Sequence, residues 1–383
     1  MTTPLPSQRG LFEIPDDVTY LNAAAYVPLP RAVREAGQQG VLTKSHPWHM
    51  AGSHGTAISE RARAAAAALL GTAADNVAIT GAVSYGIATA ARNLPIARGT
   101  RVLMIEGEFP SLALVWPELA AAAGATVEVV PRPADADWTA ALLEAIERPG
   151  APPVGLAALT PLHWSDGALI DLSRVVPALQ RQGARVVIDA TQSTGVLDLD
   201  LAALRPDFLA FPTYKWVLGP YSLAFLYVAP EHQEGMPLEN HGPARQPGSN
   251  SYIATARRFD RGERNDPIGL PMAAVGLEQV LQWDRPAIAA RLRSLTDALA
   301  AAVADLPGIA MLPRERRAPH ILGLRFAGRT PAGGMPAGLV DRLAGRGVHV
   351  ADRLGVMRVS PHVYNDQSDV AAFASALRTE LAI

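Results

Sequence analysis

Short apolar runs rich in β-branched residues alternate with amphipathic stretches through the first two thirds of the chain. The runs predict buried strands, and the stretches between them predict helices. The predicted strands cover residues 77–80, 101–105, 126–130, 154–160, 185–189, 208–211 and 223–228. This alternation predicts an α/β fold, with a mostly parallel seven-stranded sheet covered by helices on both faces.

The pattern changes beyond Gly269. A long helix is predicted over residues 271–305, then strands at 309–312 and 321–326, and a final helix from Ser368. We interpret this region as a smaller α+β lobe that the N-terminal segment joins. The expected domains are therefore an N-terminal segment (1–20), a large domain (21–270) and a small C-terminal domain (271–383). Helices are also predicted over 28–42 and 60–70, and a surface loop over 231–250.

Composition narrows the possible functions. The chain has 383 residues and a net charge of −2, which argues against bulk electrostatic binding to nucleic acid or to an anionic membrane. It has no cysteine, so disulfides, thiolate nucleophiles and cysteine-ligated metals are excluded, and we expect no metal site. Because the first residues lack a secretory pattern and no apolar run is long enough to span a membrane, we expect a cytoplasmic protein.

Lys215 is the first candidate for chemistry. Only two of the 34 basic residues are lysines, Lys44 and Lys215, and the second stands between two apolar runs. A lysine at a strand end more often extends its amine to solvent. Burial instead lowers the pKa of a lysine and activates it to form an imine, which arginine cannot do. We favour this second interpretation for Lys215.

Asp189 ends a predicted buried strand, where ligands of parallel sheets bind. The residue suits contact with a ligand or a capping role for the next turn about equally well. The turn 80–87 carries small residues and Ser84 at a predicted helix start, where a phosphate is favoured, although an ordinary helix start explains it too. It matches neither dinucleotide-binding nor nucleoside-triphosphate motifs.

Two further side chains, Phe109 and Arg358, are suited to a binding site, but each also has an ordinary structural interpretation. Phe109 follows another strand end and is suited to stack on a planar ring or to pack in the core. Arg358 lies among apolar residues and is suited to bind a carboxylate in a bidentate manner or to form an internal salt bridge.

The order of these residues resembles the class V aminotransferase family of fold-type I pyridoxal 5′-phosphate (PLP) enzymes, which includes kynureninases, cysteine desulfurases and isopenicillin N epimerase-like proteins. The resemblance spans nearly the whole chain, from Tyr20-Leu-Asn-Ala-Ala to Arg358-Val-Ser-Pro-His-Val-Tyr-Asn. Its most specific part is Asp189-Ala-Thr-Gln192 followed by Lys215.

The resemblance implies roles for individual residues. Lys215 would carry PLP as an imine and then move the substrate proton. Asp189 would pair with the pyridine N–H, and Gln192 with the ring phenolate oxygen. Phosphate would bind Ser84, the backbone of Val83 and Tyr214, and Phe109 would stack on the ring. Arg358, with Asn22 nearby, would bind the substrate α-carboxylate.

The resemblance also implies a homodimer, because residues 261–266 stand where a partner subunit reaches the phosphate. Glu263 occupies a position where the family often has threonine, which leaves open whether Glu263 or Arg264 makes that contact. Other residues that the sequence suggests for the pocket are Tyr26, Trp48, His49, His163, Trp164 and Arg264.

The leading hypothesis is a PLP enzyme that acts on an amino acid through an external aldimine and a quinonoid intermediate. Amino transfer fits the family label, and a C–S or C–C lyase or an epimerase without a catalytic cysteine is the alternative. A persulfide route is excluded because the chain has no cysteine. The rivals are a nucleotide-dependent α/β enzyme, which lacks its glycine motif here, and a non-catalytic protein of the same fold, which would not need Lys215, Asp189 and Gln192.

Overall fold

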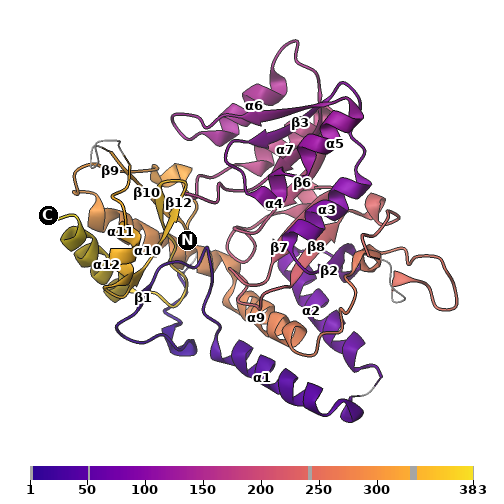
Figure 1. The fold of residues 1–383 in the computed structure, drawn as a ribbon, viewed down its shortest axis with the longest axis horizontal. Helices are drawn as coiled ribbons and strands as arrows, with labels where there is room; N and C mark the ends of the chain where they lie inside the picture. The colour runs from indigo at the N-terminus through magenta and orange to yellow at the C-terminus, as the bar shows by residue number, and fades with distance from the viewer. Residues whose placement is uncertain (1–2, 51, 240–243, 328–333, 383) are drawn as a thin grey trace. The chain divides into compact units, whose positions relative to one another are not determined.

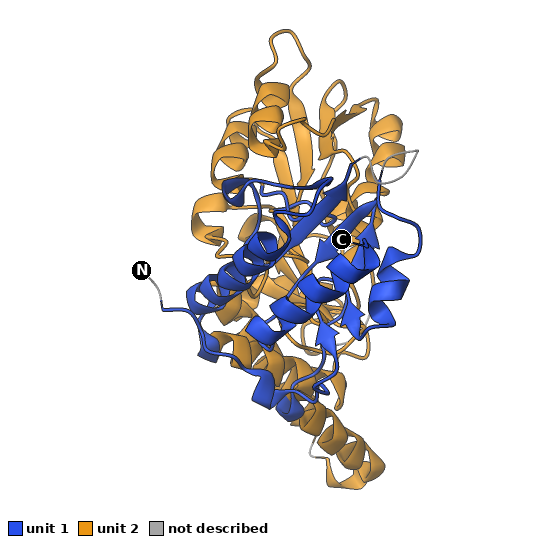
Figure 2. Cartoon of the chain, turned by 90° about the vertical axis from the view of Figure 1, so that its left-hand side faces the viewer, with its two compact units in different colours: residues 1–32, 162–169, 282–383 blue, residues 33–161, 170–281 orange. Residues whose placement is uncertain are grey.

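The computed structural model describes residues 3–50, 52–239, 244–327 and 334–382 (Figure 1). Contacts divide the chain into two compact units (Figure 2). Unit 1 comprises Met1–Ala32, Leu162–Leu169 and Gln282–Ile383, and unit 2 comprises Val33–Pro161 and Ile170–Leu281. The domain boundaries expected at residues 20 and 270 stay a prediction.

Unit 2 is built on a seven-stranded sheet with the order β2-β8-β7-β6-β5-β3-β4. All neighbouring pairs are parallel except those made by β8, which runs antiparallel to both β2 and β7. The predicted mostly parallel sheet is therefore confirmed. The strands are β2 (Val77–Thr80), β3 (Arg101–Ile105), β4 (Thr126–Val130), β5 (Val154–Leu159), β6 (Arg185–Asp189), β7 (Phe208–Pro212) and β8 (Ala224–Val228).

Helices cover both faces of this sheet. One face packs against α3, α4 and α5 in a cluster that includes Ile87, Trp116, Leu156 and Leu226. The side chains that alternate with this set, such as Ala157 and Ile188, are equally buried, so the opposite face is covered as well. The helices of unit 2 are α1 (Arg31–Ser45), α2 (His54–Leu70), α3 (Val83–Asn93), α4 (Pro110–Ala113), α5 (Trp116–Ala123), α6 (Trp138–Glu147), α7 (Leu172–Arg181), α8 (Leu201–Leu204) and α9 (Gly269–Trp283). The first residues of α1 and the last of α9 belong to unit 1.

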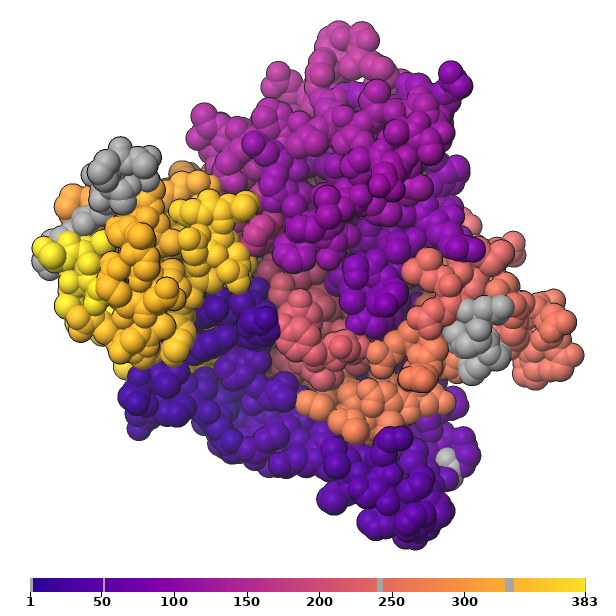
Figure 3. Space-filling view, viewed as in Figure 1, coloured from indigo at the N-terminus to yellow at the C-terminus, as the bar shows by residue number. Residues whose placement is uncertain are grey.

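Unit 1 is the α+β part that the sequence predicts. Its antiparallel sheet has the order β12-β13-β10-β9, and a parallel pair joins β1 to β11. The N-terminal segment thus lies beside the C-terminal strands, where indigo meets yellow in Figure 3. The elements are β1 (Thr19–Tyr20), β9 (Ile309–Met311), β10 (Leu322–Phe326), β11 (Val348–His349), β12 (Ala351–Arg353), β13 (Val356–Val359), α10 (Arg285–Val303), α11 (Leu339–Ala344) and α12 (Gln367–Glu380).

Two predicted helices are each divided in the structure. The predicted helix 271–305 is in fact α9 and α10, separated at Asp284, whose φ of 65° lies outside the right-handed helical region. The stretch 111–123, one of those predicted to form a helix between two strands, forms α4 and α5 instead, and each of the two begins with a proline in its first turn. Proline lacks the N–H that would continue a preceding helix, so it favours a new start. Among the described helices, none is long and apolar enough to cross a membrane.

Candidate active site

The carboxyl ends of the parallel strands in unit 2 form one edge of the sheet. Thr80, Ile105, Asp189 and Pro212 end β2, β3, β6 and β7, and these strands run in the same direction. The loops that follow carry Ser84, Phe109, Gln192 and Lys215. This edge therefore collects in one unit all the cofactor residues that the sequence singles out.

Lys215 follows β7 in a tight loop. Thr213 at the start of the loop accepts a hydrogen bond from the Gly219 N–H (2.7 Å), and its hydroxyl donates to Leu223 O (3.1 Å). A β-carbon on Gly219 would come within 2.6 Å of Thr213, so this close approach needs glycine. The Lys215 side chain is 8% exposed, and its Nζ lies 5.4 Å from the Tyr214 ring centroid and 6.0 Å from that of Phe109. The loop thus holds a buried amine near two aromatic rings.

Asp189 is buried at the end of β6. Its carboxylate accepts a hydrogen bond from the Thr191 N–H (2.8 Å), which is the capping interaction that the sequence left open. Burial raises the pKa of Asp189, while hydrogen bonds from Thr191 and the positive charge of Lys215 oppose that rise. A cation or an N–H donor beside this carboxylate would favour its charged form.

Gln192 is oriented by the residue after Lys215. The Trp216 indole Nε1 donates to Gln192 Oε1 (2.8 Å), and both side chains are buried. Because the amide oxygen is engaged, the other end of this amide is a hydrogen-bond donor. The contact links the turn after β6 to the loop that carries Lys215.

The start of α3 has no side-chain cap. Ala82 occupies the N-cap position and cannot accept hydrogen bonds from the first N–H groups of Val83 and Ser84. Val83 is buried and Ser84 is exposed. Tyr214 stacks on Tyr221 with ring centroids 4.1 Å apart. An uncapped helix start beside a hydroxyl can bind an anion.

Sequence reasoning missed Glu108, the residue before Phe109. Its Oε1 accepts a hydrogen bond from the Phe109 N–H (2.7 Å), and its Oε2 is buried without a hydrogen-bond partner among the described residues. Burial, together with the negative charge of Asp189, raises the pKa of Glu108 to about 8. The sequence signal that could have identified Glu108 is its position as an acid in the loop after a predicted parallel strand.

Arg358 and Asn22 lie in unit 1. Arg358 is on β13 and 2% exposed, and its Nη1 donates to Trp164 O (2.8 Å). Asn22 forms an isolated parallel bridge with Ser360, which follows the same strand. Arg358 Nε and Asn22 Oδ1 are buried without hydrogen-bond partners within the described ranges. Burial, together with the positive charge of Arg353, lowers the pKa of Arg358 to about 9.

Arg358 forms no salt bridge with an acid in the part of the chain that the structure describes. The internal salt bridge that the sequence allowed is therefore absent from this part of the chain. A buried guanidinium without a carboxylate is unfavourable by itself and becomes favourable when a planar anion binds.

The other suggested pocket residues are scattered. Trp48 is 72% exposed and packs against His46 and His49, and Tyr26 is exposed too. His163 is buried and bonded to Ser165 (2.8 Å). Arg264 lies 3.4 Å from the buried Asp260. Glu263 has a φ of 55°, in the left-handed region.

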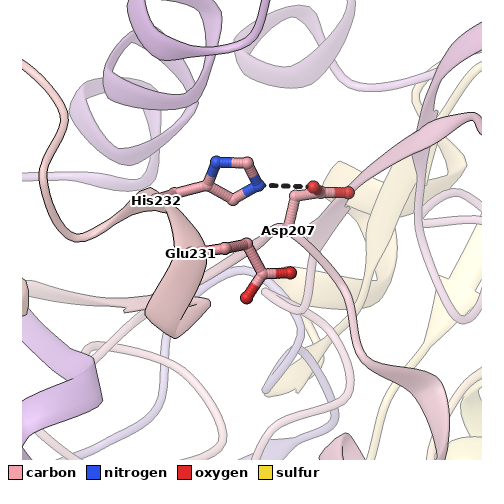
Figure 4. A group of neighbouring side chains, drawn as sticks. All are labelled: Asp207, Glu231 and His232. Atoms are coloured by element: carbon pink, nitrogen blue, oxygen red, sulfur yellow. Dashed lines mark hydrogen bonds and ion pairs between the residues drawn. The ribbon is translucent and has the colours of Figure 1, made fainter.

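A second polar cluster lies at the opposite, amino edge of the sheet (Figure 4). Asp207 directly precedes β7, and its Oδ1 accepts from His232 Nε2 (2.5 Å) and from Arg185 (3.1 Å), while Oδ2 accepts from the Val186 N–H (2.6 Å). The ligand atoms of Asp207, Glu231 and His232 lie close enough together to hold a metal ion. Because both oxygens of Asp207 already accept hydrogen bonds and Arg185 adds positive charge, we interpret the cluster as structural.

Comparisons with known proteins agree with this architecture. The family model described as Aminotransferase class-V matches residues 19–373. Isopenicillin N epimerase of Streptomyces clavuligerus is 25% identical over 96% of each chain, and kynureninase of Deinococcus radiodurans is 30% identical over 60% of this chain and 56% of its own. The crystal structure of the cysteine desulfurase CsdA from Escherichia coli superposes with a TM-score of 0.83 at 24% identity, covering 98% of this chain and 97% of the other.

Proposed function

The chain belongs to the class V aminotransferase family of PLP-dependent enzymes, and we propose that it removes a proton from the α-carbon of an amino acid by means of Lys215. The observation that carries the proposal is the buried Lys215 amine at the carboxyl edge of the sheet, within electrostatic reach of Asp189. The chain has only two lysines, so the presence of one of them at this edge supports a role for it in the chemistry.

The residues at this edge fit PLP. The buried Asp189 carboxylate suits a ring N–H, the uncapped start of α3 with Ser84 suits a phosphate, and the Phe109 ring suits stacking. Thr194 Oγ1, in the turn after β6, is buried without a hydrogen-bond partner among the described residues, as expected of a site that awaits a polar ligand. Tyr214 and Val83 would contact the phosphate, and Gln192 would donate to the ring oxygen. PLP, when bound, supplies an electron sink for the charge left on the substrate.

The roles of the protein groups follow from their surroundings. Lys215 Nζ would attach the cofactor covalently and then accept the α-proton, because a buried amine loses its own proton more readily than an exposed one. Asp189 would hold a proton on the ring nitrogen by remaining ionised beside it. The bond from Trp216 would keep Gln192 in one orientation.

Arg358 would bind the α-carboxylate of the substrate, and Asn22 would contribute its amide. The support is a buried guanidinium that donates to a backbone carbonyl and has no acid beside it in the described part of unit 1. A guanidinium forms two parallel hydrogen bonds with a carboxylate, which also fixes the orientation of the bound molecule. The substrate is accordingly an α-amino acid and not a simple amine.

Proton removal at the α-carbon is shared by several reactions. Amino transfer fits the family name, and epimerisation is the activity named for a relative of matching length. A lyase reaction is the second candidate, favoured by Phe109, which the sequence shares with kynureninase-like motifs, and by the relatives of that name. Because the chain has no cysteine, a lyase reaction here would release its leaving group directly. Assaying keto acid, the opposite enantiomer and released ammonia or sulfide with a panel of amino acids separates these outcomes.

We further propose a cytoplasmic homodimer in which residues 261–266 of one subunit approach the phosphate of the other. Asp260 anchors this segment to β2, because it accepts from the Ile79 N–H (2.8 Å) and pairs with the buried Arg63 (2.7 Å). Arg264 Nη1 is buried without a hydrogen-bond partner within the described residues. Light scattering of the purified protein at several concentrations tests the dimer, and a monomer at all of them contradicts it.

Borohydride reduction followed by peptide mapping tests the main proposal. The purified protein should be yellow, and reduction should fix the cofactor on the peptide that contains Lys215. Lys215→Ala should lose the label and the colour, while Lys44→Ala, which removes the other lysine on the exposed end of α1, should keep both. A label on Lys44, or a protein that stays colourless with added PLP, would overturn the proposal.

A further inference from the structure

Glu108 is a half-buried acid with one fully buried carboxylate oxygen, and the proposed reaction has no use for it. It lies in the loop after β3, one residue before Phe109. Its Oε1 accepts a single hydrogen bond, from the Phe109 N–H (2.7 Å), and its Oε2 is buried with no partner in the described part of the chain. An ionised carboxylate in such a place would lack most of its usual hydrogen bonds.

The charged group that acts on Glu108 is Asp189, at the end of β6. Two carboxylates whose charges act on each other do not both ionise readily. Asp189 is the more readily ionised of the two, because Thr191 donates to it (2.8 Å) and, in the protein without cofactor, Lys215 places a positive charge nearby. Among the described residues, Glu108 has one backbone donor and no basic partner that affects its charge. These contacts therefore favour a proton on Glu108 and the negative charge on Asp189.

A purely structural role for Glu108 is less consistent with this arrangement. The bond from the Phe109 N–H needs only one oxygen, which the amide of glutamine would provide at the same length. Glutamate adds only the capacity to ionise, which burial opposes and which therefore destabilises the fold. A group that destabilises the fold beside a ligand site indicates a functional role.

We propose that Glu108 is a positioning residue that acts through Asp189: its protonated carboxyl keeps Asp189 as the one negative charge at the end of the ring-binding site. Loss of the Glu108 proton places a second negative charge beside Asp189. This charge increases the proton affinity of the ring-binding site. The inference rests on the proposed function, since it assigns Asp189 to the cofactor ring. It adds an alkaline transition that belongs to Glu108.

The first test uses the protein without cofactor. The pKa of Glu108 is raised from 4.5 to about 8, so the group costs no stability below pH 4.5, and its cost grows as the pH rises to about 8. Glu108→Gln cannot ionise. Its melting temperature should equal that of the wild type at pH 4.5 and exceed it by a few degrees at pH 8.5. Glu106→Gln, in the same loop but exposed, is the matched control and should show no such divergence.

The second test uses the protein with cofactor. The absorption spectrum of the wild type should change with a midpoint near pH 8, and this transition should be absent in Glu108→Gln and retained in Glu106→Gln. An infrared band of a protonated carboxylic acid should be present at pH 6.5 in the wild type and missing in Glu108→Gln. A purely structural role would alter stability alone and leave the spectral transition in place.

The two proposals fail in different ways. If borohydride does not label Lys215, the proposed function fails whatever Glu108 does. If Lys215 is labelled but Glu108→Gln keeps the wild-type spectral transition, or melts with the same pH dependence as the wild type, the inference about Glu108 is wrong by itself.

Discussion

Each edge of the sheet in unit 2 has a buried aspartate, and the pKa values of the two are shifted in opposite directions. Asp207, before β7, accepts hydrogen bonds from His232, Arg185 and the Val186 N–H. Burial alone would raise the pKa of Asp207, but these donors and charges bring it below its usual value. Asp189, at the end of the neighbouring β6, has fewer donors, and burial raises its pKa.

The number of donors around a buried carboxylate decides whether its charge stabilises the fold or remains available to a ligand. A carboxylate that folding surrounds with donors is more stable in its charged form, so it contributes to folding at neutral pH. A carboxylate that folding buries with too few donors costs stability and retains its capacity to bind a ligand. We therefore expect the amino edge to contribute to stability and the carboxyl edge to bind the cofactor.

Asp189→Asn is expected to have the largest effect. Asparagine can still accept a hydrogen bond but cannot hold charge beside the ring nitrogen, so turnover should fall about 10³-fold, equivalent to about 4 kcal/mol. The cofactor should remain, and the cofactor-free protein should be at least as stable as the wild type at pH 7. Steady-state kinetics and thermal melting measure both. Unchanged turnover would remove Asp189 from the mechanism.

Arg358→Lys extends the comparison to the buried cation of unit 1. Lysine keeps the charge but cannot reproduce the two parallel bonds, so KM for the amino acid should rise about 100-fold, or about 2.7 kcal/mol. Arg358→Met should raise KM as well and should not lower the melting temperature, because Arg358 has no acid partner within the described residues. Lost stability with unchanged KM would indicate an internal salt bridge instead.

Asp207→Asn is expected to act on stability alone. Removing the charge weakens the bonds from His232 and Arg185, which should lower the free energy of unfolding by about 2 kcal/mol. Urea unfolding measures the change, and turnover per folded molecule should stay at the wild-type level. A large loss of turnover in folded Asp207→Asn would break the distinction between the two edges.

The pH dependence of stability should have opposite signs at the two edges. The pKa of Asp207 is lowered from 3.8, so its contribution is complete above pH 3.8 and is lost as the pH falls through the folded value. The pKa of Asp189 is raised from 3.8, so its cost is absent at low pH and grows as the pH rises. Between pH 3 and pH 7, Asp207→Asn should become less stable relative to the wild type, and cofactor-free Asp189→Asn more stable.

Metal ions should have the smallest effect. The Asp207 oxygens already accept hydrogen bonds, and Arg185 repels a cation, so neither zinc nor a chelator should change the melting temperature. A zinc-dependent rise that disappears in His232→Ala would show that the cluster of Figure 4 binds metal.

The sequence by itself determined the architecture of the large sheet and the identity of the family. Buried parallel strands are continuous apolar runs, which periodicity detects, and β2, β3, β4 and β6 begin and end where the pattern predicts. Gly71 ends α2 in the left-handed conformation, as expected of glycine after a helix. Lys215 and Asp189 stood out as candidates because a charged residue beside an apolar run is unusual, and their roles stay predictions.

Only the tertiary structure decided which buried charges have partners. The sequence left Arg358 open between a salt bridge and a ligand. It did not indicate that a carboxylate oxygen of Glu108 is buried or that Asp207 is surrounded by donors. These properties depend on residues far apart in the chain, such as Asp207 with His232 or Glu108 with Asp189. Local periodicity reports which face of an element is apolar, whereas the pKa of a side chain depends on the donors and charges that folding places around it.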